Sequence, residues 1–383
     1  MQGAKSKEQR AESKGMSNGH GHDARIGTLH GNVKEPKNVT ERRNGLRNPN
    51  RSHILFHIVR FVLFALCSML YTLPSFGADT IKVLIVNEVY PHVPGKDEKI
   101  KRMGNVEGDL IVSGSHYSGN IEVWKGDRGL YLINELPVEE YVKEVVMAEV
   151  GSNWEVEALK VQAVLSRTYG LYRKKLNGNS LFHITSSVLH QAYNGNGSDA
   201  RVSYAVEETA GEILTYNGKP IEPFYHSTCG GRTEDPQEVF GKSYPYLKPV
   251  EANCESSPYW VWERRIPLTE IEKALNISGI KESTVKSYTS TGRVRELTIV
   301  HTAGTTTVKA TDLRKLLGWS RLPSTNFSLK KDGDSMIFEG KGYGHGVGLC
   351  QWSALQMARE GKNYKEILAY FYPGTTIQLY ESR

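Results

Sequence analysis

The spacing of apolar residues changes at Val138, and this change limits the fold more than any other feature of the sequence. Over residues 79–136, stretches such as "IKVLIVN" and "GNIEVWKGDRGLYLINELP" alternate and are rich in β-branched and aromatic residues, which predicts strands joined by turns. After this region, apolar residues recur at helical spacing and form one stripe: Val138, Tyr141, Val142, Val145, Val146 and Ala148. We therefore expect a β-rich region followed by an amphipathic helix, in a mixed α+β fold.

One carboxylate lies on the apolar side of this predicted helix. Glu149 lies in the middle of the apolar stripe, whereas Glu139, Glu140, Lys143 and Glu144 fall on the other side. A carboxylate that faces packed side chains loses solvation, so it must find a partner or its pKa must rise. Pairing with Lys160 or Arg167 on the next helix is one explanation. The other is chemical, because a general acid needs a carboxyl group that stays protonated near neutral pH.

Two neighbouring carboxylates have structural explanations. Ser152 followed three residues later by Glu155 predicts a capping box for a second helix, from about Trp154 to Lys175. Glu157, in the first turns of that helix, complements the helix dipole. Of the three carboxylates in "MAEVGSNWEVEALKVQA", only Glu149 is left as a candidate for chemistry.

The positive charge of the chain is confined to its beginning. Residues 1–52 hold eleven Lys and Arg and five Asp and Glu, which accounts for the whole net charge of +6. The neutral remainder argues against a nucleic-acid partner. The segment is rich in Gly, Asn, Ser, Lys and Arg and poor in large apolar residues, so we expect a disordered basic tail.

An apolar stretch, "ILFHIVRFVLFALCSMLYTLPSF", follows the basic tail. Residues 53–78 have the layout of an export signal, with cleavage after Gly77, or of an uncleaved membrane anchor. Either interpretation places the rest of the chain outside the cytoplasm, and an anchor would keep its N-terminal end at the membrane.

Three later stretches are richer in Gly, His and polar residues than a core requires: "SSVLHQAYNGNG", "FYHSTCGGRTED" and "GKGYGHGVGLCQWSALQMA". Paired glycines let backbone approach a ligand closely. The last stretch places five glycines around His345 before a helix that begins at about Gln351, and a helix N-terminus can hold an oxygen-rich ligand. Each stretch could also be an ordinary tight turn.

These stretches, together with "AEVGSNWEVEALKVQAVLSRTYG" and "ILAYFYPGT", resemble in order and spacing the family of stage II sporulation protein D (SpoIID) and the amidase enhancer LytB. The resemblance covers residues 80–383. It implies a peptidoglycan lytic transglycosylase that cleaves the MurNAc–GlcNAc linkage of glycan strands, with a preference for strands stripped of stem peptides. In two places the chain departs from the family pattern: Val150-Gly151 replaces Met-Pro, and His190-Gln191-Ala192-Tyr193 replaces Asp-Gln-Val-Tyr.

The resemblance also implies roles for particular residues. The family's catalytic Glu aligns with Glu149. Its supporting helix positions align with Lys160 and Arg167. The expected set that positions the sugar and stabilises charge comprises Lys160, Arg167, Gln191, Tyr193, His226, Ser227, His345 and Gln351. No cofactor is required for this chemistry.

The chemistry of such an enzyme suits a single carboxylic acid. Ordinary glycosidases use two carboxylates, but the C6 hydroxyl of MurNAc can attack its own anomeric carbon and leave a 1,6-anhydro product. An alternative is a non-catalytic glycan-binding partner that stimulates a cell-wall amidase. A zinc hydrolase centred on His226 and Cys229 is a third reading.

Cysteines beyond the apolar stretch leave two alternatives open. Cys229 and Cys254 could form a disulfide outside the cytoplasm. His226, Cys229 and Cys254 could instead bind a structural zinc ion, as some SpoIID-like proteins do with ligands in this region. We expect Cys350 to pack as a small apolar residue.

The later part of the chain completes the expected organisation. We expect a SpoIID-like catalytic domain over residues 137–383, with an α/β subdomain at about 260–340. In that subdomain, "IPLTEIEKALNI" predicts a helix, and "VKSYTSTGRVRELTIVHTAGTTTVKATDLRKLLG" predicts a strand pair and a helix. The subdomain would form the second wall of a central cleft in a two-lobed fold.

Overall fold

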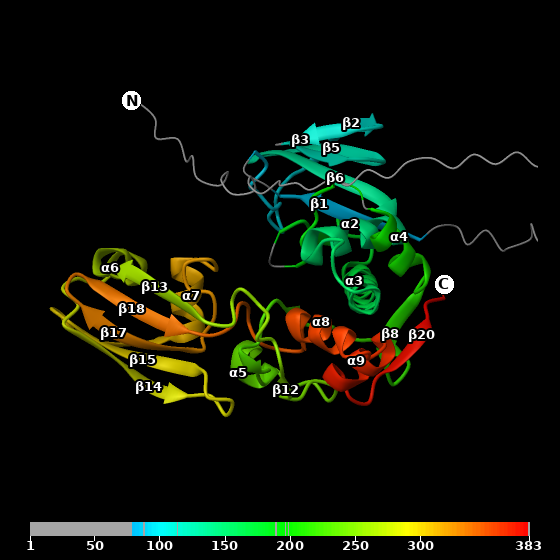
Figure 1. Ribbon diagram of the computed structural model, residues 1–383. Helices are drawn as coiled ribbons and strands as arrows, with labels where there is room; N and C mark the ends of the chain where they lie inside the picture. Colours follow the sequence, from blue (N-terminus) through cyan, green and yellow to red (C-terminus); the bar gives the residue numbers. More distant parts are fainter. Residues whose placement is uncertain are drawn as a thin grey trace, which may run out of the picture. The chain divides into compact units, whose positions relative to one another are not determined.

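The computed structural model describes residues 79–86, 89–112, 114–187, 190–195, 197 and 199–381. Its mixture of helices and sheets confirms the α+β class (Figure 1). The expected basic tail and apolar stretch lie outside the described residues. Within the described part of the chain, no helix has the length and apolar character needed to cross a membrane.

The β-rich region forms one five-stranded sheet with strand order β2-β5-β6-β1-β7. Adjacent strands in this sheet are antiparallel, except that β1 and β7 are parallel to each other. The strands are β1 (Thr80–Ile85), β2 (Lys101–Glu107), β5 (Asn120–Gly126), β6 (Gly129–Pro137) and β7 (Ile184–Thr185), and a separate pair is formed by β3 (Leu110–Val112) and β4 (Ser115–Tyr117).

Helix α2 (Val138–Val150) begins where the hydrophobic period changes, and its predicted apolar stripe is buried except at Ala148, which is half-buried. The prediction that Glu144 lies on the exposed side is wrong, because its side chain is buried beside Tyr193. Burial raises the pKa of Glu144 to about 7, against a hydrogen bond from Tyr193 that lowers it. The segment that carries Tyr193 therefore covers a face of α2 that the sequence pattern assigns to solvent.

Helix α3 (Val156–Asn177) begins two residues later than expected, and the predicted capping box is wrong. Glu155 is itself the N-cap residue, and it forms an ion pair with Arg359 at 3.1 Å. Trp154 packs edge-on against Trp352, with ring centroids 5.4 Å apart, which keeps the chain before Glu155 out of the helix. Glu157 remains in the first turn, where it complements the dipole.

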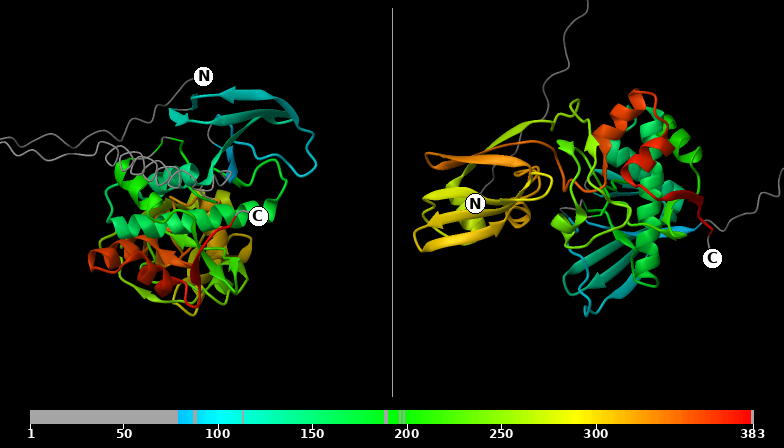
Figure 2. Two further views of the ribbon diagram at one scale, coloured as in Figure 1. Left: turned by 90° about the vertical axis from the view of Figure 1, so that its right-hand side faces the viewer. Right: turned by 90° about the horizontal axis from the view of Figure 1, so that it is seen from below.

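Two hydrophobic clusters share helix α3. Leu159 and Ala163 pack in the cluster formed with the five-stranded sheet and α2, whereas Val161 and Val164 pack in a second cluster on the other side. Figure 2 shows the helix between the N-terminal sheet and the C-terminal helices. Around it lie α4 (Ala200–Glu207), α8 (Gln351–Arg359), α9 (Tyr364–Phe371) and the sheet β20-β8-β9, made of β8 (Glu212–Tyr216), β9 (Lys219–Pro220) and β20 (Thr376–Leu379).

Short elements connect this core to the glycine-rich stretches. Strand β10 (Tyr225–His226) pairs in parallel with β19 (Leu349–Cys350), and β11 (Gly231–Arg232) pairs with β12 (Glu251–Ala252). Helix α5 (Pro236–Phe240) begins at Asp235, whose side chain accepts a hydrogen bond from the backbone of Gln237. Two distant stretches of sequence are thereby joined at β10 and β19.

A third hydrophobic cluster has all its fully buried members between Trp262 and Phe338. Two three-stranded sheets surround it, with orders β13-β18-β17 and β14-β15-β16 (Figure 1). The elements are β13 (Trp262–Pro267), α6 (Leu268–Leu275), β14 (Glu282–Tyr288), β15 (Val294–His301), β16 (Gly304–Lys309), α7 (Ala310–Leu317), β17 (Phe327–Asp332) and β18 (Ser335–Gly340). The expected strand pair before α7 is therefore a three-stranded sheet.

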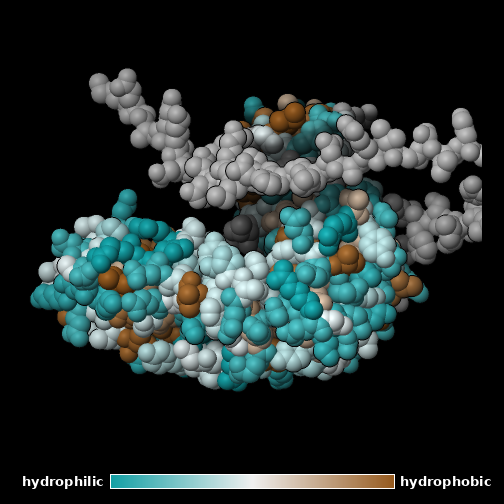
Figure 3. Space-filling view, in the orientation of Figure 1, coloured by the Kyte–Doolittle hydropathy of each residue, from teal (hydrophilic) through white to brown (hydrophobic). Residues whose placement is uncertain are grey.

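Exposed large apolar side chains are scattered over the described surface. On the face drawn in Figure 3, hydrophobic residues form separate small spots within a mostly hydrophilic surface. Such isolated residues are normal for a folded protein. Most large apolar side chains of the described residues therefore pack in the hydrophobic clusters.

Arg167 joins α3 to its neighbours through an ion pair in which the cation is buried and Glu139 is partly exposed. Its guanidinium donates to both carboxylate oxygens of Glu139, at 2.8 and 2.6 Å, and to the carbonyl oxygens of Glu212 and Val206. The Arg167 side chain is only 1% exposed. Its polar groups are fully engaged within the fold.

We predict that Arg167→Met lowers the free energy of unfolding by about 2 kcal/mol, because it removes a buried cation from the partly exposed Glu139 and leaves two carbonyl groups without their donor. The control is Arg232→Met, which breaks the exposed Arg232–Glu251 pair and should cost less than about 1 kcal/mol. Urea unfolding measures both values, and equal effects of the two substitutions would contradict the structural role assigned to Arg167.

Candidate active site

Glu149 lies in the last turn of helix α2, and three donors hold its carboxylate. Oε1 accepts hydrogen bonds from the backbone N–H of Ala192 at 2.7 Å and from the hydroxyl of Tyr225 at 3.1 Å. Oε2 accepts one longer bond, 3.3 Å, from the side-chain amide of Gln351. These donors fix the orientation of the carboxylate. Oε2 accepts fewer hydrogen bonds than Oε1, so we place the proton of the neutral form on Oε2.

The surroundings of Glu149 favour that neutral form. Burial raises the pKa of the carboxyl, and the hydrogen bonds from Ala192, Gln351 and Tyr225 oppose this rise without cancelling it. A raised pKa is what a carboxyl group needs to donate a proton near neutral pH. The geometry therefore fits a general acid.

The predicted pairing of Glu149 with Lys160 or Arg167 is wrong. Lys160 forms ion pairs with Glu157 at 3.1 Å and Glu208 at 3.8 Å, and Arg167 binds Glu139. Both cations are satisfied away from Glu149. Its placement on the apolar stripe therefore has no counter-ion to explain it.

A chain of amide and hydroxyl groups extends from Glu149 into the core. Gln191 donates to Tyr225 at 3.0 Å and accepts from Tyr141 at 2.6 Å. On the other side, the amide of Gln351 also donates to Gln162 at 3.1 Å. Each group that contacts Glu149 through a side chain is thus held by a further residue, which restricts its rotation.

Glu149 lines a cavity of about 640 Å³. Aromatic rings form much of its wall, including Trp154 and Trp352, and polar groups reach it from several elements. A concave, largely apolar wall with a few converging polar groups is typical of a ligand site. The residues that line it include Glu149, Trp154, Tyr169, His190, Phe224, Tyr225, His226, Ser227, Asp312, Arg314, Lys315, Trp319, Tyr343, His345, Gln351 and Trp352.

The structure brings together some of the residues expected at the site and not others. Four of them line the cavity with Glu149: His226, Ser227, His345 and Gln351. Gln191 lies one contact further away, behind Tyr225. Tyr193 is buried and hydrogen-bonded to Asn134, and Lys160 and Arg167 are engaged by acidic side chains outside the cavity wall.

The glycine-rich stretch around His345 forms part of the wall because glycine alone fits there. A Cβ on Gly348 would lie 2.0 Å from the carbonyl oxygen of Phe224, and one on Gly344 would lie 2.7 Å from Cβ of His226. Both glycines also have positive φ. This close approach places the His226 and His345 rings 5.5 Å apart.

Both histidines are neutral in this setting. Burial and the nearby charge of Arg314 lower the pKa of His345 to about 3, and burial also lowers the pKa of His226. Nδ1 of His226 donates to the carbonyl of Val347, while its buried Nε2 has no hydrogen-bond partner among the described residues. The two rings offer hydrogen-bonding or ligand nitrogens rather than positive charge.

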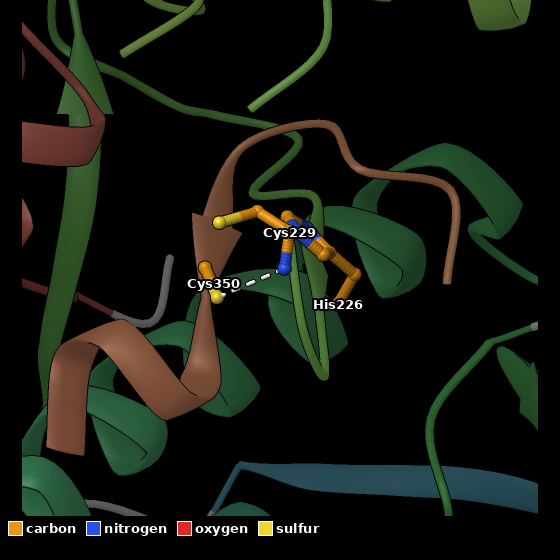
Figure 4. Close-up of side chains that lie close together, drawn as sticks. All are labelled: His226, Cys229 and Cys350. Atoms are coloured by element: carbon orange, nitrogen blue, oxygen red, sulfur yellow. Dashed lines mark hydrogen bonds between the residues drawn. The ribbon is translucent and has the colours of Figure 1, made fainter. Parts of the chain in front are cut away.

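Two buried thiols, those of Cys229 and Cys350, lie beside His226 (Figure 4). Ligand atoms of His226, Cys229 and Cys350 all lie within 4.8 Å of one another. Sγ of Cys254 lies 3.5 Å from Sγ of Cys229, and the described thiols are free. Hydrogen bonds from Cys229 and Cys350 lower the pKa of Cys254. The structure therefore groups Cys350, rather than the predicted Cys254, with His226 and Cys229, while Cys254 lies beside Cys229.

Imidazole nitrogen and thiolate sulfur are the usual ligands of structural zinc, and four such ligands complete a tetrahedral site. The unpartnered Nε2 of His226 and the cluster of thiols fit this donor set. Pairing of β10 with β19 brings Cys350 to His226, and nothing in the local sequence around Cys350 indicates this.

Sequence reasoning missed other residues of the cavity. Tyr225 precedes His226 in a stretch that was singled out, but its contact with Glu149 depends on tertiary packing. Arg314, Lys315 and Trp319 lie in the predicted helix and its C-terminal turn, with no local signal that they face Glu149's cavity. Trp154 lies in the same sequence stretch as Glu149, and its aromatic side chain was the local feature that could have indicated a place in the cavity wall.

Comparison with known proteins places this geometry in a family. The model of the stage II sporulation protein family, SpoIID, matches residues 126–216. Stage II sporulation protein D of Bacillus subtilis is 31% identical over 268 residues, which cover 64% of this chain and 75% of that protein. The chain belongs to the SpoIID family.

Other relatives of this SpoIID protein widen the comparison. An uncharacterized protein of Brachyspira hyodysenteriae is 34% identical over 275 residues, covering 70% of this chain and 74% of the relative. The amidase enhancer of Bacillus subtilis is 29% identical over 292 residues, which cover 62% of this chain and 40% of that protein. A second family model, described as a domain of unknown function (DUF8618), matches residues 246–348. The SpoIID match contains Glu149, and the second match contains α7 and His345.

We predict that Tyr225→Phe raises the pKa of Glu149, because the lost hydroxyl stabilises the ionised carboxylate. Carbon-13 NMR titration of the labelled Glu149 carboxyl measures this change. The control is Tyr343→Phe, since Tyr343 lines the same cavity without a hydrogen bond to Glu149. A pKa that stays the same or falls in Tyr225→Phe would contradict the assigned contact.

Proposed function

We propose that this SpoIID protein is a peptidoglycan lytic transglycosylase that cleaves MurNAc–GlcNAc linkages of glycan strands and leaves 1,6-anhydroMurNAc ends, with a preference for strands without stem peptides. The observation that carries the proposal is the position of Glu149. Its pKa is raised, its carboxylate is oriented by donors from three separate segments, and it lines a cavity with aromatic walls.

Glu149 acts first as the acid in this mechanism. It gives its proton to the glycosidic oxygen while the bond from that oxygen to C1 of MurNAc breaks, which releases the 4-hydroxyl of GlcNAc. Positive charge develops at C1 in an oxocarbenium-like transition state. The carboxylate of Glu149 is then free to act as a base.

The second step closes a ring. Glu149 takes the proton of the C6 hydroxyl of the same MurNAc as that oxygen bonds to C1, which regenerates the neutral carboxyl and consumes no water. An intramolecular nucleophile reacts at high effective concentration, so a second carboxylate to activate water is not needed. Asp312 is the other carboxylate of the cavity wall, and it does not hydrogen-bond to Glu149.

Residues around Glu149 have supporting roles in this proposal. Gln351 and Tyr225 orient the carboxylate, and Gln191 positions Tyr225. Neutral His345, together with Ser227, offers hydrogen bonds to sugar hydroxyl or acetamido groups from the cavity wall. Lys160 and Arg167 support the helices that carry the site and do not themselves contact sugar.

We predict that Glu149→Gln abolishes formation of anhydro products, because the amide cannot donate the proton. Mass analysis of digests of denuded and peptide-bearing peptidoglycan measures this. Glu155→Gln is the matched control from the same stretch, since Glu155 binds Arg359 outside the cavity wall, and it should retain wild-type activity. Full activity of Glu149→Gln would overturn the assignment.

The products also separate transglycosylation from hydrolysis. A hydrolase with Glu149 and Asp312 as its two carboxylates would give reducing ends, heavier by one water, and Asp312→Asn would abolish them. If Glu149→Gln instead binds glycan and stimulates a cell-wall amidase as well as wild type does, and wild type itself cleaves nothing, the chain is a non-catalytic enhancer.

The proposed substrate requires an extracytoplasmic location. Peptidoglycan lies outside the cytoplasmic membrane, and the expected export signal or anchor at residues 53–78 would deliver the chain there. The relative named amidase enhancer suggests a cell-wall amidase as a partner at the same place.

A structural zinc ion at His226, Cys229, Cys254 and Cys350 is part of the same proposal. Its role would be to fix β10 against β19, next to Tyr225. No chemical step uses it.

We predict that the purified protein holds about one equivalent of zinc by metal analysis, as four such ligands form one site. After denaturation with a chelator, the three cysteines that follow residue 78 should react with a thiol reagent, and Cys67 should also react where residues 53–78 are retained. Cys350→Ser should lose the metal. A metal-free protein in which Cys229 and Cys254 do not react would instead indicate a Cys229–Cys254 disulfide, and a metal-free protein in which every cysteine reacts would contradict both.

A further inference from the structure

Arg314 on α7 is a buried cation in the wall of the Glu149 cavity. It exposes 7% of its surface, and its guanidinium carbon lies 4.6 Å from the centre of the Trp319 ring. Its Nε donates to the carbonyl oxygen of Leu322 at 2.8 Å. These contacts fix the plane of the guanidinium and use one of its donors.

The guanidinium has no anionic partner. Within the described part of the chain, no carboxylate lies within ion-pair distance of Arg314, although every other arginine that is as deeply buried, Arg167 and Arg293, has one. Burial lowers the pKa of Arg314 to about 10, which still leaves it charged at neutral pH. The other positive side chain of this wall, Lys315, is exposed and also lacks an ion pair among the described residues.

An unpaired buried charge is costly, because it loses hydration without gaining an attractive partner. The remaining guanidinium nitrogens of Arg314 form a planar fork that matches a carboxylate with two parallel hydrogen bonds. Arg314 lines the same cavity as Glu149. The cavity therefore holds a proton donor from one part of the chain and a carboxylate-binding group from another.

We propose that Arg314, supported by Trp319 and with Lys315 beside it, binds the free lactyl carboxylate of a muramic acid residue in the glycan strand. This inference rests on the proposed function, and it identifies the group on the substrate that the α7 wall recognises. In a strand that carries stem peptides, the lactyl group is an amide without charge and with a bulky extension. The preference for denuded strands then follows from charge recognition at Arg314.

The test measures binding to two forms of the same denuded strands. One form keeps its lactyl carboxylates, and in the other they are converted to primary amides with a carbodiimide and ammonia. Binding is measured by calorimetry in the Glu149→Gln background, so that the strands stay intact. We expect amidation to weaken binding about tenfold, the value of one charge-assisted contact.

The second arm assigns the effect to Arg314. Arg314→Met should bind both forms equally, at the level of the amidated strands, and Arg314→Lys should recover part of the preference. Lys309→Met is the control, because it removes an exposed positive charge next to the start of α7 that does not line the cavity. It should retain the tenfold preference.

The outcomes separate this inference from the proposed function. Equal binding of both forms by the otherwise unmodified Glu149→Gln protein overturns carboxylate recognition and leaves the transglycosylase proposal intact. Retention of the preference in Arg314→Met overturns the role of Arg314. Failure to bind either form, in a protein whose wild type also cleaves neither, overturns both proposals. The comparison of native with amidated strands needs no substitution at Arg314, so it stands even if Arg314→Met fails to fold.

Discussion

Burial of helix α3 on all sides is the constraint on which the other parts of this structure depend. Its residues from Ala158 to Leu171 are almost all inaccessible, and they serve two hydrophobic clusters at once. A helix in this position cannot shift without disturbing both cores. The pair between Arg167 and Glu139 holds α2 against it, and Glu149 lies in the last turn of α2. The position of the Glu149 carboxylate is therefore set by packing that lies behind the cavity.

The spacing of apolar residues in the sequence predicted the elements in which buried positions recur at regular intervals. The change of period at Val138 correctly predicted the start of α2, and the place of Glu149 on its apolar stripe drew attention to a carboxylate that has a raised pKa. The capping box failed because Trp154 is held by Trp352, a residue from the far end of the chain. The prediction that Glu144 is exposed was wrong for the same reason, because the segment that contains Tyr193 covers this side chain. Tertiary contacts of this kind leave no periodic trace.

The site itself was less accessible to sequence reasoning than the helices. His226, Ser227, His345 and Gln351 were expected, and they do line the cavity. Tyr225, Cys350 and Arg314 became visible only when β10 paired with β19 and α7 took its place in the wall. Each of them belongs to a short stretch that is unremarkable alone. They are candidates because the fold brings them together from distant positions in the sequence. The same region also holds a charge, on Arg314, and a ligand nitrogen, Nε2 of His226, that have no ionic or hydrogen-bonding partner, respectively, among the described residues.

The shortest hydrogen bond to Glu149 comes from the main chain of Ala192 rather than from a side chain. Any residue except proline supplies the same N–H, so the identity of position 192 is nearly free, whereas the path of the chain through it is not. Alanine scanning would pass over this donor without effect. A proline at 192, or an ester in place of its amide, would remove it. The family's usual valine and this chain's alanine can therefore differ at that position and still build the same acid.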